Sequence, residues 1–79
     1  MKELIEYIAK NLASKPDEVR VIEEEEEQDD MRRIILKLEV APEDKGKVIG
    51  RQGRVAQAMR MLLRVAAVKS GTRAMLEIV

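Results

Sequence analysis

The sequence predicts an α+β domain with the element order α-β-β-α-α-β, in which one three-stranded sheet is covered on one face by helices. Two patterns predict it: apolar residues recur at helical spacing in residues 2–14 and 54–69, and they alternate with polar residues in residues 31–40. The 79 residues suffice for a single domain, residues 1–79, and a hydrophobic share of 46% allows it a packed core.

The N-terminal part of the chain predicts one helix followed by a short strand. Residues 2–14 place one apolar stripe on a helix, and Pro16 prevents that helix from continuing. Residues 19–22 alternate, with Val19 and Val21 on one face, and therefore predict the first strand.

An acidic run and a second strand come next. Residues 23–30 contain seven acids, and because like charges repel and Asp and Glu are poor strand formers, we expect a strand end and an exposed hairpin loop here. Residues 31–40 give the clearest strand of the chain, with Ile34 and Leu36 on one face and Ile35 on the other.

The C-terminal half predicts two helices, separated by a short glycine-flanked loop, and a last strand. Pro42 suits the first position of a short helix that ends at Gly50, and a longer helix starts after Gly53 and runs to about Lys69. The expected core stripe of that longer helix consists of Val55, Ala58, Met59, Leu62, Val65 and Ala66. Residues 73–79 alternate again and complete the sheet.

Charge is balanced over the whole chain but unevenly distributed along it. There are 15 basic and 15 acidic residues, yet residues 17–30 hold nine acids and one base, whereas residues 45–76 hold eight bases and no acid. The second segment can therefore carry a strong local positive potential that favours an anionic partner. The alternative is that each run is only a solvated surface.

The stretch GKVIGRQGRVAQAMR, residues 46–60, places two glycines three apart within an otherwise helical pattern. Glycine inside a helix costs about 1 kcal/mol relative to alanine, so a loop between two helix ends is the better interpretation. The helix after Gly53 directs its free N–H groups and positive dipole end towards that loop, which suits a phosphate. The spacing fits neither the P-loop nor the dinucleotide-binding fingerprint, but it fits the helix-GxxG-helix clamp of KH domains, which holds about four nucleotides.

The residues around this loop also resemble a known family. The opening MKELIEYIAK, the block VAPEDKGKVIGRQGR and the short closing strand resemble the small bacterial single-KH-domain RNA-binding proteins, the KhpA-like family. The resemblance covers the whole chain and implies the type II KH fold, with the functional loop at Gly50, Arg51, Gln52 and Gly53. The alternative is that the two glycines only form a structural corner between helices.

The resemblance further implies a narrow apolar groove beside the loop, in which bases are held. The residues expected to bind RNA are Lys45, Lys47, Val48, Ile49, Gly50, Arg51, Gln52, Gly53 and Arg54, with Ile35 and Lys37 on the strand side of the groove. In type II KH domains the loop between the first two strands borders this groove, so we expect the acids of residues 23–30 to weaken RNA binding or to pair with a basic partner surface. No aromatic residue is placed to stack on a base, so affinity must come from phosphate contacts, burial and hydrogen bonds to base edges.

The long helix contains more apolar residues than one buried stripe needs. Met61 and Val68 lie seven apart outside the expected stripe, and Arg64 belongs to the polar arc beside them, so we expect these three residues at a subunit interface. The expected partner is a second copy of the chain or, as the resemblance suggests, another KH-domain protein. Scattered exposed apolar residues on a monomer are the alternative.

Composition excludes several classes of function. The chain has no Cys and no His, which excludes disulfides and the usual zinc and iron sites, and we expect no cofactor or metal. No Ser or Thr has a candidate base, so we expect no enzyme activity. No apolar run approaches the roughly 18 residues of a membrane span and no signal pattern is present, which indicates a cytoplasmic protein without membrane contact.

Two functional hypotheses follow. The first is an RNA-binding protein that clamps short single-stranded RNA through the GxxG loop, as an RNA chaperone or post-transcriptional regulator; single-stranded DNA is not excluded. The second is a protein-interaction adaptor that pairs with another KH-domain protein and binds RNA only secondarily.

Overall fold

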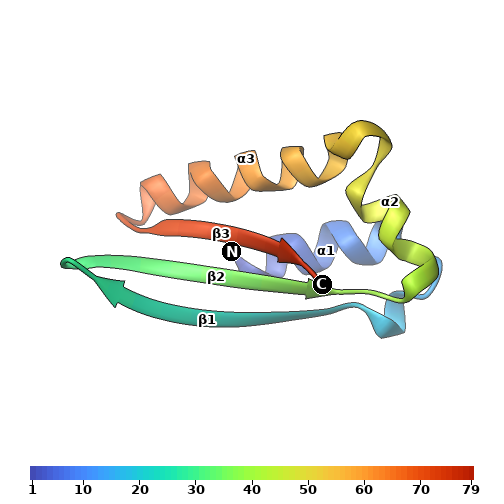
Figure 1. The fold of residues 1–79 in the computed structure, drawn as a ribbon, viewed down its shortest axis with the longest axis horizontal. Helices are drawn as coiled ribbons and strands as arrows, with labels where there is room; N and C mark the ends of the chain where they lie inside the picture. Colours follow the sequence, from blue (N-terminus) through green and yellow to red (C-terminus); the bar gives the residue numbers. More distant parts are fainter.

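Three helices cover one face of a three-stranded sheet in the computed structural model, which describes all residues, 1–79 (Figure 1). The expected order α-β-β-α-α-β is confirmed: α1 (Lys2–Leu12), β1 (Arg20–Gln28), β2 (Met31–Glu39), α2 (Lys45–Ile49), α3 (Arg54–Lys69) and β3 (Arg73–Ile78). Single 3-10 turns precede β1, α2 and α3, at Pro16–Glu18, Pro42–Asp44 and Arg51–Gly53. No helix combines the length and the apolar character that crossing a membrane requires.

The order of strands in the sheet is β1-β2-β3, so β2 is central and the other two strands are edges. β1 pairs with β2 in antiparallel fashion through a hairpin, whereas β3 is parallel to β2. A parallel neighbour requires a crossover connection, and here α2 and α3 supply it. The loop between α2 and α3 therefore lies at one end of the molecule, and the tip of the hairpin lies at the other (Figure 1).

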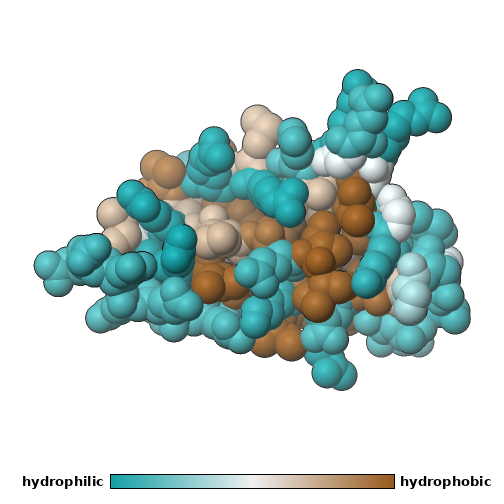
Figure 2. Space-filling view, in the orientation of Figure 1, coloured by the Kyte–Doolittle hydropathy of each residue, from teal (hydrophilic) through white to brown (hydrophobic).

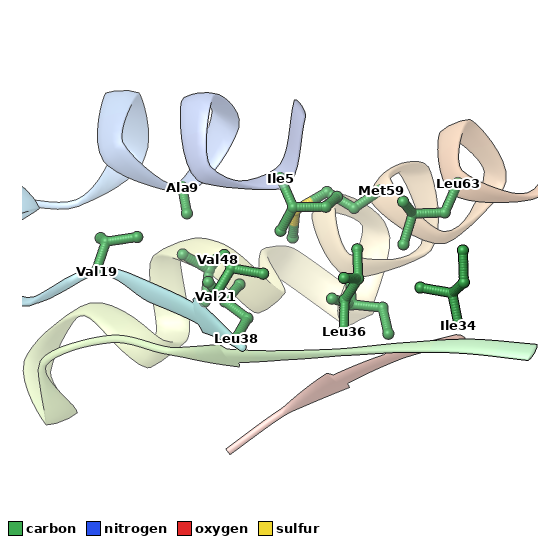
Figure 3. Close-up of a cluster of buried hydrophobic side chains, with 11 residues drawn as sticks. Ile5, Ala9, Val19, Val21, Ile34, Leu36, Leu38, Val48, Met59 and Leu63 are labelled. Atoms are coloured by element: carbon green, nitrogen blue, oxygen red, sulfur yellow. The ribbon is translucent and has the colours of Figure 1, made fainter. Parts of the chain in front are cut away.

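The core lies between the sheet and the helices (Figure 3). Leu36 and Leu38 on β2 have no exposed surface; Leu36 points towards Ile5 of α1 and Met59 of α3, and Leu38 lies beside Val21 and Val48. The alternation expected for β2 is confirmed, because Ile34, Leu36 and Leu38 all point towards the helices. The opposite face of the sheet carries no helix.

The acidic run is strand, not loop, and the expectation of a hairpin loop over residues 23–30 is wrong. β1 continues to Gln28, and only Asp29 and Asp30 form the turn. Both turn residues have positive φ, 55° and 62°, as a two-residue type I′ turn requires. Cross-strand ion pairs offset the repulsion among the acids: Glu24–Lys37 at 3.3 Å, Glu25–Arg32 at 3.0 Å and Glu26–Arg33 at 3.9 Å.

Most of the core stripe expected for α3 is also wrong: Met59 is buried and Val55 packs against the core, but the other four expected residues are not part of it. The buried residues of the helix are Ala56, Met59, Leu63 and Ala67. Leu62 and Val65, which the pattern placed in the core, are 46% and 55% exposed. The helix has apolar residues on two sides, and helical spacing alone does not indicate which side faces the sheet.

Candidate nucleic-acid interface

The loop between α2 and α3 depends on Gly50 for two separate reasons. The residue has φ 77° and ψ 172°, a region that only glycine occupies readily. A Cβ atom built on it would lie 2.5 Å from Val55 Cγ2 and 2.9 Å from the Val55 backbone nitrogen. The first turn of α3 therefore packs directly against the end of α2, and the loop is held short.

Gly53 is different, because its surroundings are open. It adopts the left-handed conformation with φ 74°, yet a Cβ atom built there would meet nothing within 4 Å. Gln52 beside it is also left-handed, with φ 57°, a conformation that costs a residue with a side chain roughly 1–2 kcal/mol. The loop thus leaves open space on the Cβ side of the half-buried Gly53, and the side chains of Arg51 and Gln52 are exposed to solvent.

A buried carboxylate fixes the helix that leads into the loop. Asp44, which immediately precedes α2, is fully buried and accepts hydrogen bonds from the Ser14 hydroxyl at 2.7 Å, the Ser14 N–H at 3.0 Å and the Lys15 N–H at 3.0 Å. These bonds, with those from Ser14 the strongest, lower the pKa of Asp44 to about 2 in spite of its burial. The role of Asp44 is not visible in the sequence, since no pattern pairs it with Ser14, thirty positions away.

The structure brings most of the predicted loop residues together but separates others from them. Ile49 is 39% exposed beside the loop, whereas Val48 has no exposed surface and supports α2 from the core. Ile35 and Lys37 belong to the face of β2 turned away from the helices, since the residues alternating with them are the buried ones. Lys37 is paired there with Glu24. Neither Ile35 nor Lys37 shares a surface with the loop.

The apolar groove beside the loop is instead a cleft between α3 and the edge strand β3. Its first part is lined by Arg60, Leu63, Ala74, Met75 and Leu76. Figure 2 shows hydrophobic surface gathered across the middle of this face, with hydrophilic side chains around it. The groove expected from the resemblance had Ile35 and Lys37 as its strand side, and no residue of β3 was expected to line it.

The positive charges of residues 45–76 extend from the loop along α3 to the start of β3, and most of them have no acidic partner. Of the eight bases in residues 45–76, only Lys47 has a carboxylate within 4 Å, namely Asp44 at 3.7 Å. The acids of β1 lie on the opposite edge of the sheet from β3, and the hairpin tip lies at the far end from the loop. The expectation that residues 23–30 form an acidic loop bordering the groove is therefore wrong for the glutamates, which belong to β1; only Asp29 and Asp30 remain in the hairpin turn.

The predicted interface residues are divided between two surfaces. Met61 and Val68 are 66% and 72% exposed, and with Leu62 and Val65 they form an apolar stripe on α3 that no other element covers. Arg64 instead lines the cleft beside β3, next to Val68. We refer to Met61, Leu62, Val65 and Val68 below as the outer stripe of α3.

Comparison with known proteins shows which family the chain matches. The family model described as KhpA/KhpB, KH domain, matches residues 2–78. The RNA-binding protein KhpA of Clostridium acetobutylicum is 54% identical over 79 residues, which are the whole of both chains. The proteins of the same name from Caldanaerobacter subterraneus subsp. tengcongensis and Clostridium perfringens are 51% and 49% identical, again over the whole of both chains. No solved structure matches the chain significantly.

Proposed function

The chain belongs to the KhpA/KhpB family of KH domains, and from this we propose that it clamps short single-stranded RNA at the loop Gly50–Gly53. The relatives named above carry the name RNA-binding protein. In this proposal the protein acts in the cytoplasm by holding RNA strands, as a chaperone or a post-transcriptional regulator, and not by changing them chemically.

The observation that carries the proposal is the open backbone at Gly53, beside free cations. A phosphate can approach that backbone closely because no side chain fills the space around it. Arg51 and Arg54 flank the position, Lys45 lies on α2, and none of the three has a carboxylate within 4 Å. The first turn of α3 has no side-chain cap, so its dipole adds to the attraction.

The cleft between α3 and β3 is the place for the bases. Its floor is apolar at Leu63, Ala74 and Leu76. β3 is an edge strand, so one row of its backbone N–H and C=O groups has no strand partner and can bond to base edges. Aromatic stacking does not contribute, because Tyr7, the one aromatic residue, belongs to α1.

The test is fluorescence anisotropy with a labelled mixed-sequence RNA, in which Arg51→Asp/Gln52→Asp is compared with the parent. The control, Lys10→Asp/Asn11→Asp on α1, makes the same change of net charge at two exposed positions. We expect the loop variant to lose binding at least tenfold and the control to remain near the parent, with equal melting temperatures. Equal binding by both variants would show that the loop is only a structural corner and does not bind RNA. The same measurement with single-stranded DNA of the same sequence shows how much the 2′-hydroxyls contribute to the affinity.

The outer stripe of α3 favours a second element of function, which is association with another KH domain. Exposed apolar residues on one helix face, on a protein with a small core, are often buried against another subunit. We assign this face to a homodimer, in which each copy presents the same stripe, or to a heterodimer with a second KH-domain protein.

Sedimentation of the parent and of Met61→Glu/Val65→Glu tests the homodimer. Both residues are more than half exposed, so the substitutions should leave the monomer folded. A dimer mass for the parent at micromolar concentration and a monomer mass for the variant are the expected results. A parent that sediments as a monomer rules out the homodimer and leaves the heterodimer, and with it the adaptor hypothesis.

A further inference from the structure

We propose that the nucleic-acid track does not end at the GxxG loop but continues along the α3–β3 cleft to a distal phosphate-binding site formed by Arg64, Arg73 and Arg33. The inference rests on the proposed function and extends it, because it assigns one single strand a longer footprint than the roughly four nucleotides that a KH loop holds.

The first observation is that the cleft is continuous along the helix. Beyond Leu63 it opens into a hollow of about 300 Å³, lined by Arg33, Arg64, Ala67, Val68, Thr72, Arg73, Ala74 and Met75. Ala74 and Met75 also line the part of the cleft nearer the loop, so the two parts adjoin. Arg64 lies ten residues beyond Arg54, which is about 15 Å along the helix axis.

The second observation is an unfavourable pair of charges at the end of the cleft. Arg33 and Arg73 are direct partners in the register of β2 with β3, so both side chains leave the face of the sheet that is turned away from the helices, and they border the end of the cleft from that side. Like charges directly opposite one another destabilise a sheet. Arg33 has only a distant partner in Glu26 at 3.9 Å, and neither Arg73 nor Arg64 has a carboxylate within 4 Å. An anion that bridges the arginines would relieve this repulsion.

The third observation concerns the nearest competing carboxylate. Asp29, in the hairpin turn, lines an adjoining hollow together with Arg33 and Arg73 but forms no ion pair with either arginine. The site therefore holds three arginines, with Asp29 at its border and Glu26 beside Arg33. We infer that Asp29 lowers the affinity for a phosphate and that its replacement by Asn raises it.

The occupant that fits is the sugar–phosphate backbone of the strand already held at the loop. Arginine forms bidentate bonds with phosphate, and Arg60, Arg64 and Arg73 all line the two adjoining parts of the cleft. An eight-nucleotide strand should therefore contact these distal arginines, whereas a four-nucleotide strand anchored at the loop should not.

The experiment measures the affinity of single-stranded RNAs of four and eight nucleotides at about 50 and 200 mM salt. The distal variant is Arg64→Gln/Arg73→Gln, and the matched control is Lys10→Gln/Arg20→Gln, which removes two positive charges from α1 and from the opposite edge of the sheet. A longer strand offers more binding registers, which raises its apparent affinity. Because both variants are compared with the parent on the same RNA, this effect is the same for all three proteins and does not influence the comparison.

For the eight-mer, the salt slope of the distal variant should be shallower by about 1.4, since each neutralised phosphate contributes about 0.7. The parent should then lose about 7-fold more affinity than the distal variant between the two salt concentrations. The four-mer should bind the parent and both variants alike, and Asp29→Asn should tighten the eight-mer only. Because the like-charge pair is relieved, Arg73→Gln should melt no lower than the parent without RNA.

Other results separate the two proposals. If the parent binds neither RNA, the proposed function fails. If the parent binds both RNAs and the distal variant weakens the four-mer as much as the eight-mer, or leaves the eight-mer slope unchanged, only the distal site is refuted. An Arg73→Gln protein that melts below the parent would show that Arg73 stabilises the sheet, and would also refute the distal site.

Discussion

Replacing Gly50 by alanine should be far more damaging than replacing Gly53, although both glycines belong to the same GxxG loop. The sequence treats the two positions alike. The structure does not, because Gly50 faces the first turn of α3 and Gly53 faces open space.

The expected cost at Gly50 has two parts. Its backbone angles lie in a region that disfavours every residue with a side chain, which costs roughly 1–3 kcal/mol. The new Cβ atom would also lie 2.9 Å from the Val55 nitrogen, and relieving that contact by a backbone shift costs a further 1–3 kcal/mol, roughly. A loss of about 3 kcal/mol or more in the free energy of unfolding follows, which lowers the melting temperature of a domain of this size by about 12–24 °C.

Gly53→Asn is the matched comparison, since asparagine tolerates the left-handed conformation. We expect it to cost under about 1 kcal/mol. Its side chain would occupy the space proposed for a phosphate, so it should weaken RNA binding while the melting temperature hardly changes. Gly50→Ala should lower the melting temperature and therefore weaken binding by a different route.

Thermal and urea unfolding, followed by circular dichroism, measure these differences directly. Val55→Ala in the Gly50→Ala background should recover part of the loss, because it removes the Cγ2 atom that lies 2.5 Å from the new methyl group. Equal melting temperatures for Gly50→Ala and Gly53→Asn, or a Val55→Ala effect that is only additive, would refute the close packing of α3 against the loop.

Three further predictions concern the fold that positions the site. Leu63→Ala should cost about 2–5 kcal/mol, as core truncations do, whereas Leu62→Ala should cost well under half of that; equal losses in urea unfolding would contradict the orientation of α3. Hydrogen bonds lower the pKa of Asp44 to about 2 from its ordinary 3.8, so the folded state binds the proton more weakly than the unfolded state does. The stabilisation by the carboxylate is therefore complete above about pH 4 and is lost as the pH falls towards 2. The difference in stability between the parent and Asp44→Asn should shrink over that range, and a constant difference would exclude the carboxylate as its cause. Asp29→Asn/Asp30→Gly, the preferred type I′ pair, should raise the free energy of unfolding by about 1 kcal/mol, and an unchanged value would show that the turn is not strained.

Local chemistry was sufficient for the elements and for the loop. Alternation in residues 31–40, Pro42 before a short helix and glycines at 50 and 53 each act on their own neighbours, so the chain order of helices and strands could be predicted from them. The same is true of the residues Arg51 and Gln52, which are part of the loop wherever that loop lies. The resemblance named the family, and the comparisons show it.

Ion pairs and hydrogen bonds between residues far apart in the chain could not be predicted from such local patterns. A loop was predicted for the acidic run because the repulsion among neighbouring acids is visible in the sequence. The cations that offset this repulsion, such as Arg32 and Lys37, belong to the other strand, and the sequence does not show that they pair with these acids. The buried bond network of Asp44 with Ser14 is hidden in the same way, because its partners are thirty residues apart.

The groove was decided by tertiary structure alone. α3 has two apolar sides, and only its packing on the sheet determines that Leu63 is buried and Met61 exposed. Strand order has the same effect, because β3 becomes an edge beside α3 and the cleft forms there, not at Ile35 on the far face of β2. The sequence by itself determined which residues form the loop between α2 and α3, at which we propose phosphate binding, since backbone angles are local. The tertiary structure decided where the apolar cleft lies, since a cleft exists only between elements.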